Sequence, residues 1–259
     1  MGKKKRPIIL VTNDDGVTAV GLRCLIEVMK TLGKVIIVAP DKPQSGMGHA
    51  ITVSGPLRLN KILTDGTHDE YSCSGTPVDC VKLAINKILK GKPDLVVSGI
   101  NHGSNSSINI IYSGTMSAAL EGGIENIPAV GFSLLDYSSD ADFHVAKKYI
   151  KNIAENILNH GLPEGVCLNV NIPAVSKEKI KGVKICRQAK ANWDDDYIEQ
   201  FDPRQQPFYW LTGVFRNFDH GNDTDEWALK NNYISVVPVQ FDFTAHHAIS
   251  IIKKWKIDE

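Results

Sequence analysis

The chain has 259 residues, with 29 basic and 29 acidic side chains. That length is enough for one large α/β domain with an extension, and it does not require two independent hydrophobic cores. Because the charges balance, the chain lacks the clustered positive field that holds a nucleic-acid backbone, so we expect a small-molecule ligand and no nucleic-acid partner. Its five cysteines include no Cys-x-x-Cys pair, which predicts reduced, buried thiols rather than a zinc or redox site.

The first residues, Met1 to Arg6, are rich in lysine and arginine. The apolar run that follows, Ile8 to Val11, is interrupted at Asn13 and is too short for an export segment. No other apolar stretch is long enough to cross a bilayer. We therefore expect a cytoplasmic protein with no membrane partner.

The front of the chain predicts a strand, a helix and a second strand. Continuous apolar, β-branched runs at residues 7–12 and 34–39 are typical of strands buried on both faces of a parallel sheet. Between them, apolar residues recur at helical spacing over residues 19–32, and Gly33 follows in the C-cap position. Residues 51–59 alternate around a Gly-Pro pair, which predicts a β-hairpin inserted beside the sheet.

The middle of the chain continues this alternation. A helix is predicted where Thr76 provides an N-cap and Pro77 occupies the first helical position. The predicted elements that follow this start are a helix at 77–89, a strand at 94–98, a helix at 115–125, a strand at 127–134 and a helix at 142–158. Sustained alternation of this kind predicts an α/β fold with an open, mostly parallel sheet flanked by helices.

The C-terminal part is less regular. Residues 167–172 and 183–186 predict two more strands, but residues 190–222 mix polar residues, prolines and single aromatics without a clear period. That segment is too long for an ordinary loop and too aromatic for a disordered linker, so we interpret it as an arm that packs against another subunit.

The end of the chain predicts a strand and a helix. Residues 233–239 predict a strand whose Pro238 favours an edge position, and residues 246–255 predict a terminal helix. We expect a catalytic core over residues 1–188 and segments for oligomerisation over residues 189–259, within one continuous domain.

Polar side chains gather after three of the predicted strands, where ligands bind in an open parallel sheet. Asp14 and Asp15 follow the first strand, Ser45 lies in the loop after the second, and Asn101 follows the third. This set of oxygen ligands suits Mg²⁺, Mn²⁺ or Ca²⁺, and a divalent cation would relieve the repulsion between adjacent carboxylates. The alternative is a solvated turn, because Asp and Gly are common turn residues.

The run Tyr112-Ser113-Gly114-Thr115 opens a predicted helix of small residues. Such a helix start presents backbone N–H groups at the positive end of the helix dipole and is suited to phosphate. The alternative is an ordinary cap, in which Ser113 or Thr115 only satisfies the helix end. A cation beside a phosphate site predicts hydrolysis of a phosphomonoester.

Several motifs occur in order along the chain. They are Thr12-Asn13-Asp14-Asp15-Gly16, Ala39-Pro40-Asp41 with Gln44-Ser45-Gly46, Ser74-Gly75-Thr76-Pro77-Val78-Asp79-Cys80, Ser98-Gly99-Ile100-Asn101-His102-Gly103, Tyr112-Ser113-Gly114-Thr115 and a fainter Tyr233-Ile-Ser-Val-Val-Pro. In these residues the chain resembles the survival protein SurE family of nucleotidases, and several motifs in register are more specific than one. The chain departs from the family pattern in the run Asn101 to Ser106, whose flank is looser, and at Met116-Ser117.

The resemblance implies a Rossmann-like core and phosphatase activity on nucleoside 5′- and 3′-monophosphates, with short polyphosphates as further candidates. It implies one divalent cation per subunit, Mg²⁺, Mn²⁺ or Ca²⁺, held by Asp14, Asp15, Ser45 and Asn101. It also implies a homodimer or homotetramer with exchanged C-terminal segments.

Roles in catalysis follow from this assignment. Asp14 or Asp15 would accept a proton from the attacking water. The residues expected to receive the phosphate and substrate are Asn13, Gly46, Gly103, Ser113, Gly114 and Thr115. His102 is a candidate general acid, although a structural or solvent-facing histidine is the favoured interpretation. Two other functions stay open: a phosphatase that forms an aspartyl-phosphate, and a nucleotide- or metal-binding regulatory module without turnover.

Overall fold

A computed structural model describes residues 6–64, 68–138, 140–255 and 257. The basic start on which the expected location partly rests, residues 1–5, lies outside this description. Within the described ranges, no helix is long and apolar enough to span a membrane.

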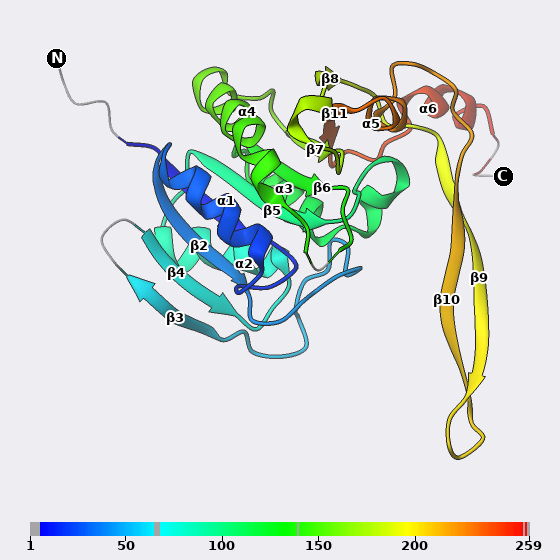
Figure 1. The fold of residues 1–259 in the computed structure, drawn as a ribbon, viewed down its shortest axis with the longest axis horizontal. Helices are drawn as coiled ribbons and strands as arrows, with labels where there is room; N and C mark the ends of the chain where they lie inside the picture. Colours follow the sequence, from blue (N-terminus) through cyan, green and yellow to red (C-terminus); the bar gives the residue numbers. More distant parts are fainter. Residues whose placement is uncertain (1–5, 65–67, 139, 256, 258–259) are drawn as a thin grey trace.

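The fold is a nine-stranded, mostly parallel sheet with helices on both faces, and a two-stranded hairpin projects from it (Figure 1). The strands of the sheet lie in the order β3-β4-β2-β1-β5-β6-β7-β11-β8. Their bounds are β1 (Ile8–Thr12), β2 (Lys34–Pro40), β3 (Leu59–Thr64), β4 (His68–Cys73), β5 (Leu95–His102), β6 (Ala129–Leu134), β7 (Val166–Ile172), β8 (Gly182–Ile185) and β11 (Tyr233–Gln240); the hairpin comprises β9 (Ala191–Phe201) and β10 (Pro207–Asn217). The predicted α/β class, with its open and mostly parallel sheet, is confirmed.

Helices connect most of the parallel strands. They are α1 (Val20–Lys30), α2 (Pro77–Leu83), α3 (Gly114–Ile124), α4 (Lys147–His160), α5 (Asp225–Lys230) and α6 (His246–Ile252), with the shorter helical segments η1 (Ala84–Leu89), η2 (Ser107–Tyr112), η3 (Phe143–Ala146) and η4 (Lys177–Lys179). The predicted start of α2 is confirmed, because Thr76 and Asp79 form a capping box with Pro77 in the first turn.

The sheet is buried on both faces, as its apolar strands predict. Ile9 and Val11 of β1 pack into a core with α1 and α4, whereas Leu10 packs with α2 and α3 on the opposite face. All three side chains are fully buried. Alternate residues of one strand thus enter different cores, which explains why the sequence shows a continuous apolar run instead of an alternating one.

The order of the sheet reverses at β1. β2 lies on one side of β1 and β5 on the other, and both pair with it in parallel. The loops that leave the carboxyl ends of these three strands therefore diverge around a crevice, which is the usual ligand site of an open α/β sheet.

The inserted hairpin lies further along the chain than predicted. It is formed by β3 and β4, whereas residues 51–58 contain no strand. The side chain of Asp79 accepts hydrogen bonds from the backbone and hydroxyl of Thr52, and the Thr76 hydroxyl donates to the carbonyl of Ala50. This segment is bound to the start of α2 instead of to a partner strand.

The prediction that residues 190–222 lack regular secondary structure is wrong, because most of this segment forms a β-hairpin. The strands β9 and β10 are eleven residues each and pair in antiparallel register around a turn at residues 202–206. Two hydrogen bonds of Asp202 close the turn. Its backbone N–H donates to the carbonyl of Gln206, and its carboxylate accepts from the backbone N–H of Arg204. Both faces of the hairpin are mostly exposed, so polar residues are spread along it and obscure the period of two.

Two smaller predictions also need correction. α1 ends at Lys30 with Thr31 as its C-cap, so Gly33 lies beyond the cap; a Cβ there would come within 2.4 Å of the carbonyl oxygen of Pro7. β11 is not an edge strand, because it lies between β7 and β8. Its pairing with β8 ends at Val236, and Pro238 follows where no N–H is required on that side.

Candidate active site

A pocket of about 320 Å³ opens at the carboxyl edge of the sheet. The residues that line it are Asp14, Asp15, Ser45, Gly46, Asn101, His102, Ser104, Asn105, Asn109, Tyr112, Ser113 and Tyr137. The four side chains expected to hold a cation therefore line one pocket, although they come from three separate segments at the carboxyl ends of β1, β2 and β5.

The loop after β1 places two carboxylates in the pocket. Asp14 is buried, and its Oδ1 accepts a hydrogen bond of 2.5 Å from the Thr115 hydroxyl. The Asn13 side chain donates to the carbonyl of Gly16 at 3.0 Å, which closes the turn behind the carboxylates. Gly16 has a φ of +99°, a conformation that favours glycine.

The loop after β2 carries Ser45 and is fixed at several points. The backbone N–H of Gln44 donates to the carbonyl of Asp14 at 2.7 Å, which holds the loop against the first one. Further along, His49 Nε2 lies 2.9 Å from the buried carboxylate of Glu121 in α3, and Lys82 binds the same carboxylate at 2.5 Å. Ser45 is therefore held between the end of β1 and helix α3.

A distortion at the end of β5 places Asn101. The register with β6 shifts between Ser98 and Asn101, and Gly99 adopts a φ of +122°. A Cβ on Gly99 would lie 2.3 Å from the carbonyl oxygen of Phe132. The Asn101 amide nitrogen donates to the carbonyls of His102 and Gly103, so its Oδ1 remains available as an oxygen ligand.

The start of α3 lies directly against Asp14. The Ser113 hydroxyl accepts from the backbone N–H of Met116 and caps the helix. A Cβ on Gly114 would lie 2.7 Å from the Cβ of Asp14, so only glycine permits this approach. The predicted alternative of a cap thus describes one role of Ser113, but the same residue also lines the pocket.

Burial perturbs both carboxylates. It raises the pKa of Asp14 to about 6, and the hydrogen bond from Thr115 opposes that rise. Burial also raises the pKa of Asp15, while the neighbouring His102 lowers it. Among the described residues, Asp15 Oδ2 is buried without a hydrogen-bond partner. Ionising both carboxyl groups at this buried position therefore favours an added positive partner.

In the described part of the chain, no group of three or more His, Cys, Asp or Glu side chains is arranged so that it could hold a metal ion. The predicted site contains only two such residues, and its other oxygen atoms come from a hydroxyl and an amide. His102 lines the pocket, and its ring packs edge-on against Phe143 at 4.8 Å between centroids.

The six predicted phosphate and substrate residues fall into two groups. Gly46 and Ser113 line the pocket, whereas Asn13, Gly103, Gly114 and Thr115 lie behind its wall and fix the residues in front of them. Gly103, for example, leaves room for the ring of Tyr137, which a Cβ would approach within 2.1 Å.

Five lining residues are not among the predicted site residues: Ser104, Asn105, Asn109, Tyr112 and Tyr137. Tyr137 follows β6 as Asp14 follows β1, so applying the strand-end rule to the fourth strand would have found it. Asn109 is oriented by Trp193 of the hairpin, whose indole N–H donates to its Oδ1 at 2.8 Å. A contact with a residue so distant in sequence leaves no local signal.

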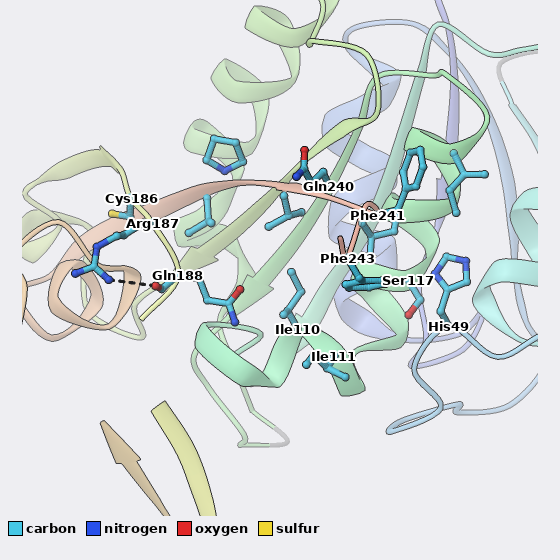
Figure 2. Close-up of a pocket in the computed structure, with 15 residues that line it drawn as sticks. His49, Ile110, Ile111, Ser117, Cys186, Arg187, Gln188, Gln240, Phe241 and Phe243 are labelled. Atoms are coloured by element: carbon cyan, nitrogen blue, oxygen red, sulfur yellow. Dashed lines mark hydrogen bonds between the residues drawn. The ribbon is translucent and has the colours of Figure 1, made fainter. Parts of the chain in front are cut away.

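A second pocket, of about 900 Å³, is larger but differs in chemistry (Figure 2). It is bordered by Ile110 and Ile111 of η2 and by Phe241 and Phe243 after β11, with His49 at one side. None of the predicted cation or phosphate residues is among those that line it. The smaller, polar pocket is the one that contains the two carboxylates of Asp14 and Asp15.

Comparisons with known proteins agree with the fold and the motifs. The family model described as "Survival protein SurE" matches residues 9–195. The chain is 63% identical to the 5′-nucleotidase SurE of Flavobacterium psychrophilum, over 98% of this chain and 99% of that protein. It is 61% identical to the 5′-nucleotidase SurE of Christiangramia forsetii, over 99% of both. The crystal structure of the SurE protein from Aquifex aeolicus aligns with a TM-score of 0.83 at 41% identity, covering 95% of this chain and 98% of that one. The chain therefore belongs to the survival protein SurE family.

Proposed function

We propose that this chain hydrolyses nucleoside 5′-monophosphates to a nucleoside and phosphate. The observation that carries the proposal is the pocket in which Asp14 and Asp15 face a helix start suited to phosphate. Identity above 60% along nearly the whole length to two proteins named 5′-nucleotidase supports the same substrate class. Nucleoside 3′-monophosphates and short polyphosphates are proposed as further substrates.

We also propose that the site holds one divalent cation, Mg²⁺, Mn²⁺ or Ca²⁺. Asp14, Asp15, Ser45 and Asn101 would hold it. The residues fit such an ion, because the donor set is entirely oxygen and Asp15 Oδ2 has no hydrogen-bond partner among the described residues. When bound, the cation would offset negative charge on the phosphoryl oxygens and lower the pKa of a bound water.

The residues of the chain supply the rest of the chemistry. A carboxylate of Asp14 or Asp15 accepts a proton as water forms a bond to phosphorus and the bond from phosphorus to the ester oxygen breaks. That proton is then available to the departing sugar oxygen. The start of α3 orients the phosphoryl group through Ser113, and Thr115 fixes Asp14 so that the carboxylate needs no rearrangement.

A phosphate-release assay tests the proposal. Purified protein is incubated with AMP, with and without Mn²⁺ or Mg²⁺, and free phosphate is measured; parallel samples contain 3′-AMP and tripolyphosphate. We expect release from AMP that stops when EDTA removes the cation. Failure of the folded protein to release phosphate with any nucleotide and metal would instead support a binding module, and a phosphoenzyme trapped on Asp14 or Asp15 would support an aspartyl-phosphate mechanism.

We further propose a homodimer or homotetramer in which C-terminal segments are exchanged. In α6 no residue is buried, and Phe243, just before it, is 87% exposed. The apolar pocket of Figure 2 ends at this segment, through Phe241 and Phe243. An exchanged segment from a second copy would cover apolar surface that the described residues of one protomer leave open.

A further inference from the structure

The serines that follow Asn101 depart from the family pattern, and the proposed hydrolysis gives them no role. Ser104 lines the active-site pocket, and Ser106 is buried behind it. The Ser106 hydroxyl meets the carboxylate of Glu226, which comes from helix α5, far along the chain. A chain of hydroxyl groups therefore leads from the wall of the pocket to a carboxylate.

The direction of these hydrogen bonds follows from counting hydrogens. An ionised carboxylate only accepts, so the single hydroxyl hydrogen of Ser106 is given to Glu226. The hydroxyl oxygens of Ser104 and Ser106 are 2.5 Å apart, and Ser104 must donate in that contact. The backbone N–H of Ser106 also donates to Ser104 Oγ at 3.1 Å. Ser104 therefore faces the pocket with one unused lone pair and no hydrogen.

Two side chains near Ser104, Tyr137 and Asn109, offer hydrogen-bond donors to a ligand instead of acceptors. The Tyr137 hydroxyl accepts from the backbone N–H of Ser104 at 3.2 Å, so its own hydrogen points elsewhere. Asn109 uses its Oδ1 to accept from Trp193, which leaves the amide hydrogens as its groups for a ligand. This wall of the pocket thus places an acceptor lone pair at Ser104 beside hydrogen-bond donors of Tyr137 and Asn109.

That combination fits an alcohol better than other parts of a nucleotide. A phosphate oxygen or a base carbonyl only accepts and would meet the lone pair of Ser104 unfavourably, whereas a hydroxyl donates to Ser104 and accepts from Tyr137. Ser104 is three residues from Asn101, a chain separation of at most about 10 Å. A hydroxyl next to the phosphoryl group of a nucleotide belongs to its sugar.

We propose that Ser104, oriented through Ser106 by Glu226, accepts a hydrogen bond from a ribose hydroxyl and makes the enzyme selective for ribonucleotides. Ser104 and Tyr137 contact the sugar, whereas Ser106 and Glu226 are positioning residues. This inference rests on the proposed nucleotidase function and adds the recognition of the sugar to it.

The test compares AMP with its 2′-deoxy and 3′-deoxy analogues in wild type and in Ser104→Ala. Assays are run at mildly alkaline pH, because burial raises the pKa of the Glu226 carboxyl and the proposed hydrogen-bond directions require its ionised form. In wild type we expect kcat/KM to fall by about three- to tenfold when the contacted hydroxyl is removed. The selectivity ratio is kcat/KM for AMP divided by kcat/KM for the deoxy analogue. In Ser104→Ala this ratio should approach one, because the partner of the hydroxyl is gone.

Two other variants keep the test decisive if Ser104→Ala does not fold. Tyr137→Phe alters an exposed side chain and should lower the same ratio. Ser106→Ala touches no substrate but frees the hydrogen of Ser104, so its ratio should lie between those of wild type and Ser104→Ala. The exposed Ser54→Ala is the matched control and should keep the wild-type ratio.

Each outcome has a separate meaning. If wild type hydrolyses AMP and both deoxy analogues equally well, or if Ser104→Ala keeps the wild-type ratio, the sugar contact is wrong. A wild-type ratio in Ser106→Ala would overturn the role of Glu226 and Ser106. If wild type releases phosphate from no nucleotide, the proposed nucleotidase function itself fails.

Discussion

The carboxyl edge of the sheet and the β9–β10 hairpin use polar and aromatic residues in opposite ways. At the edge, side chains are fixed by contacts within the protomer, as Asp14 is by Thr115. On the hairpin, large side chains such as Trp210 are exposed, and their aromatic contacts are with one another, for example Phe208 with Trp210. Figure 1 shows the hairpin extending away from the sheet.

The two regions differ in whether one protomer is sufficient to form them. The pocket is formed by loops of a single chain, whereas the hairpin exposes apolar surface that its own chain covers only in part. Substitutions at the edge should therefore change turnover, and substitutions on the hairpin should change assembly. One contact connects the hairpin to the pocket: Trp193 of β9 donates a hydrogen bond to Asn109 and orients it.

The largest effect is expected from the two carboxylates. Asp14→Asn and Asp15→Asn should each lower kcat for AMP by about 10²- to 10⁴-fold, because the neutral amide neither accepts the proton nor compensates a cation. Asp195→Asn, an exposed position on the hairpin, is the matched control and should retain wild-type turnover. Steady-state phosphate release measures all three. Wild-type activity in both edge variants would remove these residues from the mechanism.

The second effect concerns stability and pH. Folding raises the pKa of Asp14 from its ordinary value of 3.8 to about 6, so the folded state holds its proton more tightly than the unfolded chain. The stabilisation is fully present below pH 3.8 and is lost as the pH rises through about 6. The difference between the two pKa values corresponds to about 3 kcal/mol.

Urea unfolding of EDTA-treated protein checks the sign of this effect. Between about pH 4 and about pH 7, wild type should lose about 2 kcal/mol more unfolding free energy than Asp14→Asn, whose amide does not titrate. At neutral pH and without metal, the variant should be the more stable protein. Parallel pH curves for the two proteins would show that Asp14 is not strained by its burial.

The sequence predicted the sheet and the edge because their signals are local. The apolar run 8–11 predicts a buried strand by itself, and residues 9–11 of that run are buried in the structure. The rule that ligands bind after parallel strands placed Asp14, Ser45 and Asn101 in one pocket. The assignment of those residues to a cation and to catalysis stays a prediction, as does the division of the chain at residue 188.

What the sequence did not predict depends on contacts between distant segments. Residues 51–58 alternate like a strand, but Thr52 in this segment donates its backbone N–H and hydroxyl to the distant Asp79 instead of pairing with a strand. The hairpin at 191–217 lacks a one-sided apolar period, because neither face is buried within the protomer. Glu226 reaches Ser106 across 120 residues, a contact that no local pattern encodes.

A third, smaller effect tests the contact between α3 and the edge. In Gly114→Ala the new methyl group would lie 2.7 Å from Asp14 Cβ and 2.9 Å from its Oδ2, so the helix or the carboxylate must shift. We expect kcat/KM for AMP to fall by about tenfold to a hundredfold, because a displaced catalytic group loses its alignment. Gly123→Ala in the same helix is the matched control, since its Cβ would meet no atom closer than 3.6 Å. Equal activity in both variants would show that α3 need not lie against Asp14.

The smallest effect on folding and turnover should come from the hairpin. Trp210 is 61% exposed, so Trp210→Ser should change the unfolding free energy of the protomer by only about 0.5 kcal/mol and leave AMP turnover close to wild type. The same variant should form a smaller assembly in light scattering, because an aromatic side chain contributes strongly where it is buried between subunits. Val20→Ser, at 64% exposure on α1 beside the sheet, should leave the mass unchanged. If Trp210→Ser keeps the wild-type mass, the exposed aromatics of the hairpin do not hold the oligomer, and the exchanged C-terminal segment would have to supply the whole contact.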